Sequence, residues 1–162
     1  MKIVTWNVNS VNVRLPNVLK YLEDFQPDIL CLQELKCLEE KYPIENFNDV
    51  GYESIQSCQK TYNGVSIVSK SQPTDVQYNP VCIDQQEKRS IAATYNGVRV
   101  INFYVVNGQS VDSDKYKHKL KWLKKSELYI KDQLAKYPKL IVLGDFNIVP
   151  NESDAYEFSP DS

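Results

Sequence analysis

Residues 2–34, KIVTWNVNSVNVRLPNVLKYLEDFQPDILCLQE, decide the class of the fold. Their first part, residues 2–9, is rich in β-forming side chains and predicts a strand with a polar end. Residues 14–25 predict a helix that tolerates Pro16 in its first turn and carries apolar side chains at helical spacing (Leu15, Val18, Leu19, Leu22 and Phe25). The apolar run at residues 29–32 predicts a buried strand. A strand, a helix and a second strand of these lengths form a βαβ-like unit of an α/β protein.

The middle of the chain predicts several antiparallel strands. Residues 61–69 (TYNGVSIVS) and 93–105 (ATYNGVRVINFYV) each carry an Asn-Gly pair between β-forming residues, the strongest short-range signal for a hairpin. Because the flanks of the two Tyr-Asn-Gly-Val stretches do not match, we interpret them as one turn chemistry used twice and not as a duplicated unit.

The last third of the chain predicts one long helix and one strand. The helix starts at Ser113 or Asp114, either of which can cap it, and continues to about Lys136. Its apolar face is expected to contain Tyr116, Leu120, Leu123, Ile130 and Leu134. Residues 140–145 (LIVLGD) predict the last strand, and residues 151–162 predict a loop.

The composition predicts a single globular domain. The 162 residues are 42% hydrophobic and 25% charged, with a net charge of −2. This net charge does not indicate nucleic-acid binding. It does not exclude it either, because the carboxylates of a metal site would offset basic residues in the net charge. No apolar stretch approaches a membrane span and no signal peptide follows Met1, so we expect a cytoplasmic protein without a membrane partner. Four cysteines without a C-x-x-C pair are expected to be reduced thiols and not zinc ligands (Cys31, Cys37, Cys58 and Cys82).

Polar side chains lie at the ends of four predicted strands, where ligands of α/β sheets usually bind. They are Asn7, Glu34, Tyr104 with Asn107 just beyond it, and Asp145 with Asn147. Because a strand exposes alternate residues on one face, we expect Asp145 and Asn147 to point the same way. Oxygen donors without paired histidine or cysteine favour Mg²⁺ or Mn²⁺ and metal-assisted phosphoryl chemistry.

Each of these residues also has a purely structural explanation. Asn7 or Asp145 could be a turn residue or a helix cap. Glu34 could be a solvated strand end, and Tyr104 a half-buried sheet tyrosine with a hydrated hydroxyl. His118, the only histidine, lies among lysines of the long helix, and we expect it to be a solvated surface residue and not a catalytic base.

Six stretches together resemble the exonuclease III group of the endonuclease/exonuclease/phosphatase superfamily: TWNVNSVNVRLP, QPDILCLQELK, QKTYNGVSIVSK, VINFYVVNG, KYKHKLKWL and LGDFNIVP. The resemblance implies a four-layer α/β/β/α sandwich with two sheets back to back. It also implies a Mg²⁺-dependent DNA phosphodiester hydrolase of DNA repair that degrades duplex DNA from 3′ ends, cuts beside abasic sites and cleans blocked 3′ termini. LQELK and YVVNG favour this DNA-acting branch over phosphatases of lipids or inositol phosphates. Asn107, within YVVNG, is expected to bind substrate.

The resemblance further implies a role for each matching residue. Glu34 corresponds to the principal Mg²⁺ ligand, and Asn7 to an asparagine beside the metal and the phosphate. Tyr104 corresponds to a tyrosine that contacts the scissile phosphate. Asp145 corresponds to the aspartate that orients or deprotonates the attacking water, and Asn147 to the asparagine that holds the phosphate.

The later part of the family pattern has no counterpart here. In the family it contributes further strands, an aspartate in an N-x-G-R-I-D-like segment and a histidine near the end, and His118 does not align with that histidine. We therefore expect residues 1–162 to be a single incomplete domain. Three explanations stay open: a fragment or nicked piece completed by a missing carboxyl-terminal segment, a truncated half-domain that binds metal or DNA without turnover, or a chain completed by another copy. A phosphatase of a small substrate is the alternative within the superfamily.

Overall fold

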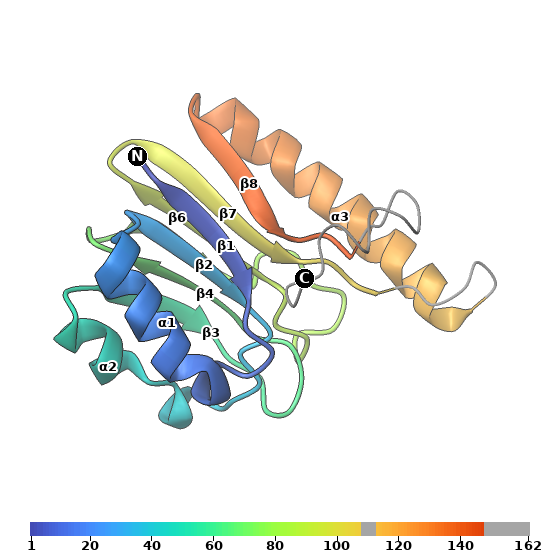
Figure 1. Cartoon of the computed structure of the whole chain (residues 1–162). Helices are drawn as coiled ribbons and strands as arrows, with labels where there is room; N and C mark the ends of the chain where they lie inside the picture. The colour runs from blue at the N-terminus through green and yellow to red at the C-terminus, as the bar shows by residue number, and fades with distance from the viewer. Residues whose placement is uncertain (108–112, 148–162) are drawn as a thin grey trace, which may run out of the picture.

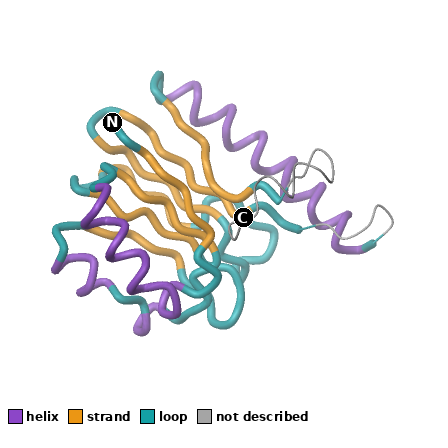
Figure 2. Tube along the Cα trace, in the orientation of Figure 1, coloured by secondary structure: helices purple, strands orange, loops and turns teal. Residues whose placement is uncertain are grey.

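The computed structural model describes residues 1–107 and 113–147, which form two four-stranded sheets with helices outside them (Figures 1 and 2). The elements in chain order are β1 (Ile3–Asn7), α1 (Val11–Phe25), β2 (Ile29–Gln33), the 3₁₀ turn η1 (Glu39–Lys41), α2 (Ile44–Asp49), β3 (Glu53–Ser57), β4 (Val65–Ser69), β5 (Thr74–Tyr78), β6 (Ser90–Tyr95), β7 (Val98–Tyr104), α3 (Asp114–Lys136) and β8 (Leu140–Asp145). The predicted loop at residues 151–162 lies outside the described residues. Within the described residues, no helix is both long and apolar enough to cross a membrane.

The two sheets are built alike. The first has the order β1-β2-β4-β3 and the second the order β5-β6-β7-β8. In the first sheet β1 and β2 are parallel and joined through α1, and in the second β7 and β8 are parallel and joined through α3. The other pairs are antiparallel. Since β8 also contacts β1 and β2, the two parallel pairs face each other across the sandwich.

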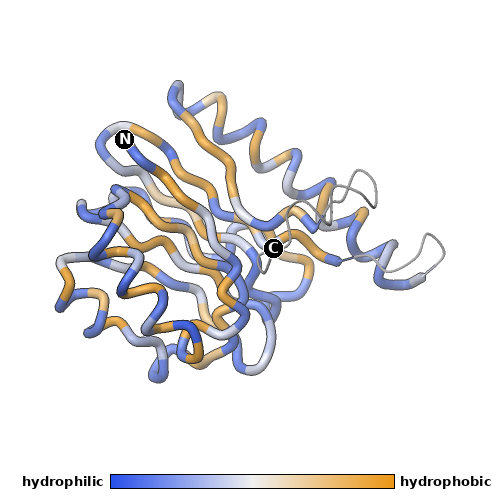
Figure 3. Tube along the Cα trace, viewed as in Figure 1, coloured by the Kyte–Doolittle hydropathy of each residue, from blue (hydrophilic) through white to orange (hydrophobic). Residues whose placement is uncertain are grey.

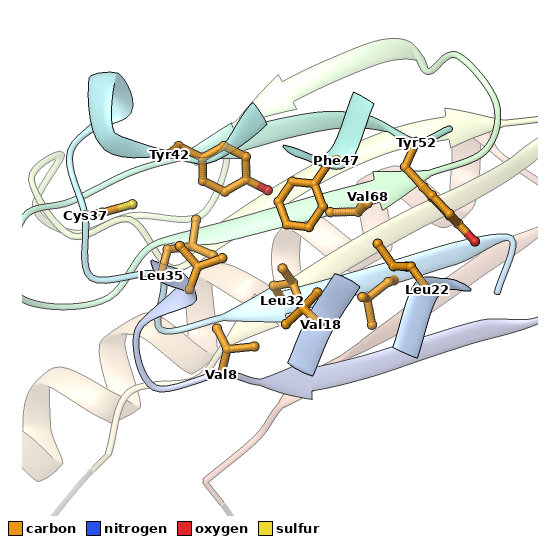
Figure 4. Packing of buried hydrophobic residues seen from close by; sticks show 12 residues of the cluster. Val8, Val18, Leu22, Leu32, Leu35, Cys37, Tyr42, Phe47, Tyr52 and Val68 are labelled. Carbon is orange, nitrogen blue, oxygen red and sulfur yellow. The ribbon is translucent and has the colours of Figure 1, made fainter. Parts of the chain in front are cut away.

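Three apolar layers hold the sandwich together and confirm the predicted four-layer α/β/β/α class. One cluster lies between the first sheet and α1 with α2, where Phe47 and Tyr42 pack above Leu32 (Figure 4). A second cluster lies between the two sheets, and a third between the second sheet and α3 around Trp122. Figure 3 shows the corresponding apolar stretches along the strands and on α1 and α3.

A buried polar network fixes the two sheets relative to each other. The Asn102 amide nitrogen of β7 donates to the carbonyl oxygens of Leu32 (3.0 Å) and Ser66 (2.9 Å) in the first sheet. The Gln33 amide donates back to Asn102 Oδ1 at 2.8 Å. Neither side chain is exposed by more than 1%. Because a buried amide left unpaired costs about 1–3 kcal/mol, this network favours one register of the sheets.

The buried face of α3 differs from the predicted one. Leu120 and Leu134 are 50% and 56% exposed, so the prediction for these two was wrong, whereas Leu123 and Ile130 pack against the second sheet. The helix instead buries Trp122 and Gln133. Gln133 Oε1 accepts a 2.7 Å hydrogen bond from Nε of Arg99, whose guanidinium is buried. A buried charge needs polar partners. The periodicity of apolar residues cannot show that a glutamine is buried because it is hydrogen-bonded to such a charge.

The two Asn-Gly pairs have similar backbone angles but different roles. Asn96-Gly97 joins β6 and β7 directly, which confirms the second predicted hairpin. Asn63-Gly64 instead ends the longer connection 58–64 between β3 and β4. There Gly64 lies against Leu35, since an added Cβ would lie 2.9 Å from Leu35 Cβ. The Asn63-Gly64 turn therefore packs against the segment that follows β2 and does not form a tight hairpin.

The first helix begins earlier than predicted. It starts at Val11, with Ser10 as the N-cap, so Pro16 lies beyond the first turn. Val11 is fully buried. Its N–H donates to the carbonyl oxygen of Leu35 at 3.1 Å, a tertiary contact that periodicity could not indicate.

Candidate active site

Four of the predicted site residues meet at one edge of the sandwich. Asn7 is the last residue of β1, Glu34 directly follows β2, Tyr104 ends β7 and Asp145 ends β8. Parallel strands present their carboxyl ends at the same edge of a sheet, and each sheet contributes one parallel pair. The topology therefore collects side chains that lie far apart in the sequence.

The side chain of Asn7 joins the two carboxylates. Its Nδ2 donates to Glu34 Oε1 at 2.9 Å and to Asp145 Oδ2 at 2.8 Å. Its Oδ1 accepts from the backbone N–H of Asn9 at 3.1 Å, so three hydrogen bonds define the orientation of the amide. Tyr104 adds a 3.0 Å hydrogen bond from its hydroxyl to Glu34 Oε1. The result is a connected, partly buried polar cluster with both carboxylates on one amide.

The environment of Glu34 favours its ionised form. Burial acts to raise the pKa of this carboxyl, but the hydrogen bonds from Asn7 and Tyr104 and the nearby Lys36 ammonium outweigh it and hold the pKa below its ordinary value. Lys36 Nζ lies 3.2 Å from Glu34 Oε2 and also contacts Asn9 Oδ1. Glu34 therefore offers a negative charge at neutral pH, as a cation ligand requires.

Unusual backbone conformations occur at the same edge. Glu34 and Asn147 have φ of 57° and 49°, in the left-handed region that non-glycine residues rarely adopt. The Glu34 carbonyl oxygen accepts from the Ser10 N–H at 2.8 Å, which holds this conformation in place. Such residues cluster at sites where the direction of a side chain matters more than local backbone energy.

Asp145 and Asn147 come together by a turn and not by strand alternation. The strand ends at Asp145, and the N–H of Asn147 donates to Asp145 Oδ1 at 3.0 Å. The Asn147 amide nitrogen donates to the carbonyl oxygen of Val105 at 2.7 Å, which links the segments after β7 and β8. The expectation of a shared strand face was therefore wrong, although the two residues are adjacent in space. Asn107 lies three residues beyond β7 and is exposed, and its substrate-binding role stays a prediction.

Several residues around the site were not identified from the sequence. Glu87 Oε1 lies 2.6 Å from His118 Nε2, a contact that the sequence did not indicate, and the His118 side chain, expected to be a solvated surface residue, is 30% exposed. Lys119 Nζ donates to the carbonyl oxygen of Asn147 at 3.3 Å, and Arg89 lies over the ring of Tyr104. A charged side chain at a loop or helix surface carries no sequence signal for such contacts.

The donor set suits a hard divalent cation. The described residues contain no group of three or more His, Cys, Asp or Glu side chains that could hold a metal ion by themselves, and the four cysteines are free thiols. Mg²⁺ is typically held by one or two protein carboxylates, while substrate phosphate and water complete its shell. Glu34, with Asp145 joined to it through Asn7, meets that requirement. A surface hollow of about 530 Å³ near Leu22 and Lys70 lies toward the amino end of β2 and contains none of these residues.

The Tyr104 phenol is expected to stay protonated far into the alkaline range. Burial and the adjacent Glu34 charge raise its pKa to about 12, although the Arg89 charge acts in the opposite direction. We expect the ¹³Cζ NMR signal of Tyr104, assigned by its loss in Tyr104→Phe, to titrate near pH 12. Glu34→Gln removes one cause of the shift and should move the midpoint downward. A midpoint at or below pH 10 in the unmodified protein would show that the phenol is not held against a carboxylate.

Comparison with known proteins identifies the family of this chain. Residues 4–162 match the model of the Endonuclease/Exonuclease/phosphatase family. The chain is 29% identical to the exodeoxyribonuclease III of Haemophilus influenzae over 160 residues, 95% of this chain and 60% of the relative. It resembles the structure of a 3′-5′ exonuclease from Neisseria meningitidis with a TM-score of 0.90 and 50% identity, over 94% of this chain and 60% of the other.

A third relative is an AP endonuclease from Archaeoglobus fulgidus, with a TM-score of 0.87 and 38% identity over 94% of this chain and 59% of the other. The chain thus spans about 60% of the length of these relatives. The resemblance noted in the sequence is confirmed over that span. The chain belongs to the endonuclease/exonuclease/phosphatase family, and its relatives include exodeoxyribonuclease III and AP endonuclease.

Proposed function

We propose that this chain carries the amino-terminal part of a Mg²⁺-dependent DNA phosphodiester hydrolase of DNA repair. One observation carries the proposal: the Asn7 amide joins the carboxylates of Glu34 and Asp145 at an edge where both sheets end. A purely structural strand end would not need two carboxylates on one amide beside a tyrosine with a raised pKa.

Glu34 is the residue proposed to hold Mg²⁺, with Asn7 beside it, and Mn²⁺ could substitute. The cation would neutralise charge that develops on the phosphate oxygens and the leaving group. Asp145 would accept a proton from the attacking water or orient it, because its oxygens already accept hydrogen bonds from fixed donors. Asn147 would hold the phosphate, and Tyr104 would contact it by moving the hydrogen of its neutral hydroxyl from Glu34 to a phosphate oxygen.

Duplex DNA is the proposed substrate, either at 3′ ends or beside abasic sites. The support is the naming of relatives: the Neisseria protein is a 3′-5′ exonuclease, the Archaeoglobus protein is an AP endonuclease, and a related Neisseria 3′ phosphatase was solved with a product DNA hairpin. Because this chain spans about 60% of those proteins, we propose that a carboxyl-terminal segment or another chain completes the domain. The cytoplasmic location stays a prediction.

The same partial coverage supports a second candidate. A half-domain could bind metal or DNA without turnover, because the family pattern expects further site residues beyond those described here. The two candidates differ in product formation and not in binding, so one assay separates them.

The test is cleavage of an end-labelled duplex with one abasic site, with Mg²⁺ and with EDTA, alongside the intact mass of the protein used. We expect EDTA-sensitive cleavage that Glu34→Gln reduces by roughly 10²-fold or more. Glu45→Gln, which removes an exposed carboxylate from α2, is the matched control and should cleave normally. DNA binding without product would favour the half-domain, and cleavage that persists in EDTA or in Glu34→Gln would contradict the metal role.

A further inference from the structure

The segment immediately before β6 reaches the candidate active site through two charged side chains. Glu87 and Arg89 lie in the connection between β5 and β6, and neither belongs to the set Asn7, Glu34, Tyr104, Asp145 and Asn147. Arg89 is the closer of the two, since its guanidinium carbon lies 4.8 Å from the centre of the Tyr104 ring. Arg89 therefore contacts a proposed phosphate-binding residue through its ring, and Glu87 contacts Arg89.

Arg89 contacts both the ring and the backbone of Tyr104. Its Nη1 donates to the Tyr104 carbonyl oxygen at 3.3 Å, and its own carbonyl oxygen accepts from the Tyr104 N–H at 2.8 Å. A guanidinium over an aromatic face is attracted by about 0.5–2 kcal/mol, most where the contact is shielded from water. Since the Arg89 side chain is only 12% exposed, the contact limits how the Tyr104 ring can turn.

Glu87 holds Arg89 in this position and ties it to helix α3. Its Oε2 accepts from Arg89 Nε at 3.1 Å, and its Oε1 lies 2.6 Å from His118 Nε2. One carboxylate oxygen thus contacts the segment before β6 and the other contacts α3. With 21% of its side chain exposed, Glu87 is better shielded than the surface pairs of α3 and its interactions are correspondingly less screened.

These contacts form a continuous path from α3 to the proposed metal ligand. It runs from His118 to Glu87, from Glu87 to Arg89, across the ring of Tyr104, and from the Tyr104 hydroxyl to Glu34 Oε1 at 3.0 Å. The backbone of Tyr104 is already held by its pairing with Asp145 of β8 and by the hydrogen bond from its N–H to the Arg89 carbonyl oxygen. What the side-chain path adds is the direction of the phenol, which the strands do not determine.

We propose that Glu87 is a positioning residue of this site: it holds Arg89 over the Tyr104 ring and also contacts His118, so that the Tyr104 hydroxyl stays beside Glu34. The effect of Glu87 on catalysis rests on the proposed function. Its effect on the position of the Tyr104 ring does not. A plain surface ion pair would have neither effect, and the two explanations make different predictions.

The first arm of the test does not depend on turnover. We expect Glu87→Gln to move the NMR signals of the Tyr104 ring, assigned by comparison with Tyr104→Phe, and those of the single histidine. The matched control is Glu127→Gln, which breaks the exposed pairs with Lys124 and Lys131 on α3 and should leave the Tyr104 signals in place. Unmoved Tyr104 signals in folded Glu87→Gln would overturn the proposal even if DNA cleavage is confirmed.

The second arm is a double-mutant cycle in the labelled-duplex assay. We expect Glu87→Gln to lower kcat by roughly ten- to a hundredfold with KM changed by less than about twofold. In a Tyr104→Phe background, the same substitution should change kcat by less than about twofold, because the hydroxyl it positions is absent. Equal effects in both backgrounds would assign Glu87 to general stability and contradict the proposal.

A variant of Arg89 covers the case in which Glu87→Gln does not fold. Arg89→Lys keeps the charge but loses the planar group that lies on the ring. It is expected to move the same Tyr104 signals, and unmoved signals would again overturn the proposal. If the unmodified protein does not cleave DNA, the proposed function fails while the NMR arm still decides the role of Glu87.

Discussion

Gly144→Ala is expected to destabilise the protein by more than about 4 kcal/mol, a loss that few single substitutions cause. Gly144 has a φ of 138°, and a Cβ built on it would lie 1.9 Å from the carbonyl oxygen of Phe103. Gly144 is paired with Phe103 in the parallel ladder between β7 and β8, next to the Tyr104–Asp145 pair. The end of β8 must therefore move away from β7 and carry Asp145 out of reach of Asn7.

The matched control is Gly97→Ala. Gly97 also has positive φ, 82°, but an added Cβ would meet no atom within 4 Å. We expect this variant to lose only about 1–2 kcal/mol, the cost of left-handed backbone in a residue with a side chain. Urea unfolding of both variants separates backbone strain from the steric clash. Similar losses for the two glycines would contradict the close approach of β7 and β8.

Asp145→Asn is expected to lower DNA cleavage by roughly 10²- to 10⁴-fold, the usual contribution of a positioned general base. Both hydrogen bonds to Asp145 come from donors: Asn7 Nδ2 at 2.8 Å and the Asn147 N–H at 3.0 Å. A carboxylate accepts both, whereas an amide offers one oxygen and turns its NH₂ group toward the other donor. The substitution thus removes the base and leaves one donor of the site without its acceptor.

The measurement is kcat on the abasic duplex, together with DNA affinity and thermal unfolding. Affinity is not expected to fall, since the substitution removes a negative charge and no phosphate donor. Asp132→Asn, at an exposed position of α3 paired with Lys136, is the matched control and should cleave like the unmodified protein. Cleavage by Asp145→Asn within about threefold of normal would remove Asp145 from the handling of water.

Local features of the sequence identified several of the elements and the positions of the candidate site residues along the chain. β-forming runs, a helical pattern between two of them and one Asn-Gly turn identified β1, α1, β2 and the β6–β7 hairpin. Asn7, Glu34, Tyr104 and Asp145 were each placed at a strand end because an apolar run stops beside them. The four-layer class and the family followed from the order of the motifs.

Local patterns did not predict the position of residues that contact partners far away in the sequence. Gln133 is buried because Arg99 needs an acceptor, so apolar spacing misjudged the face of α3. Gly64 packs against Leu35 and does not form a tight hairpin. His118 of α3 contacts Glu87, which lies in the connection between β5 and β6. In each case the deciding contact joins residues that no periodicity connects.

The sequence by itself determined which side chains would stand at the carboxyl ends of the strands, since side-chain periods of 2 and 3.6 residues are local properties of a chain. Only the tertiary structure decided that one amide, Asn7, would join Glu34 and Asp145, because this requires the two sheets to pack face to face in one register. That register depends on buried partners such as Asn102, and the position of Asp145 within the second sheet depends on the close approach of β7 and β8 at Gly144. Distances across a packed interior are set by all the side chains that fill it, and no single stretch of sequence encodes them.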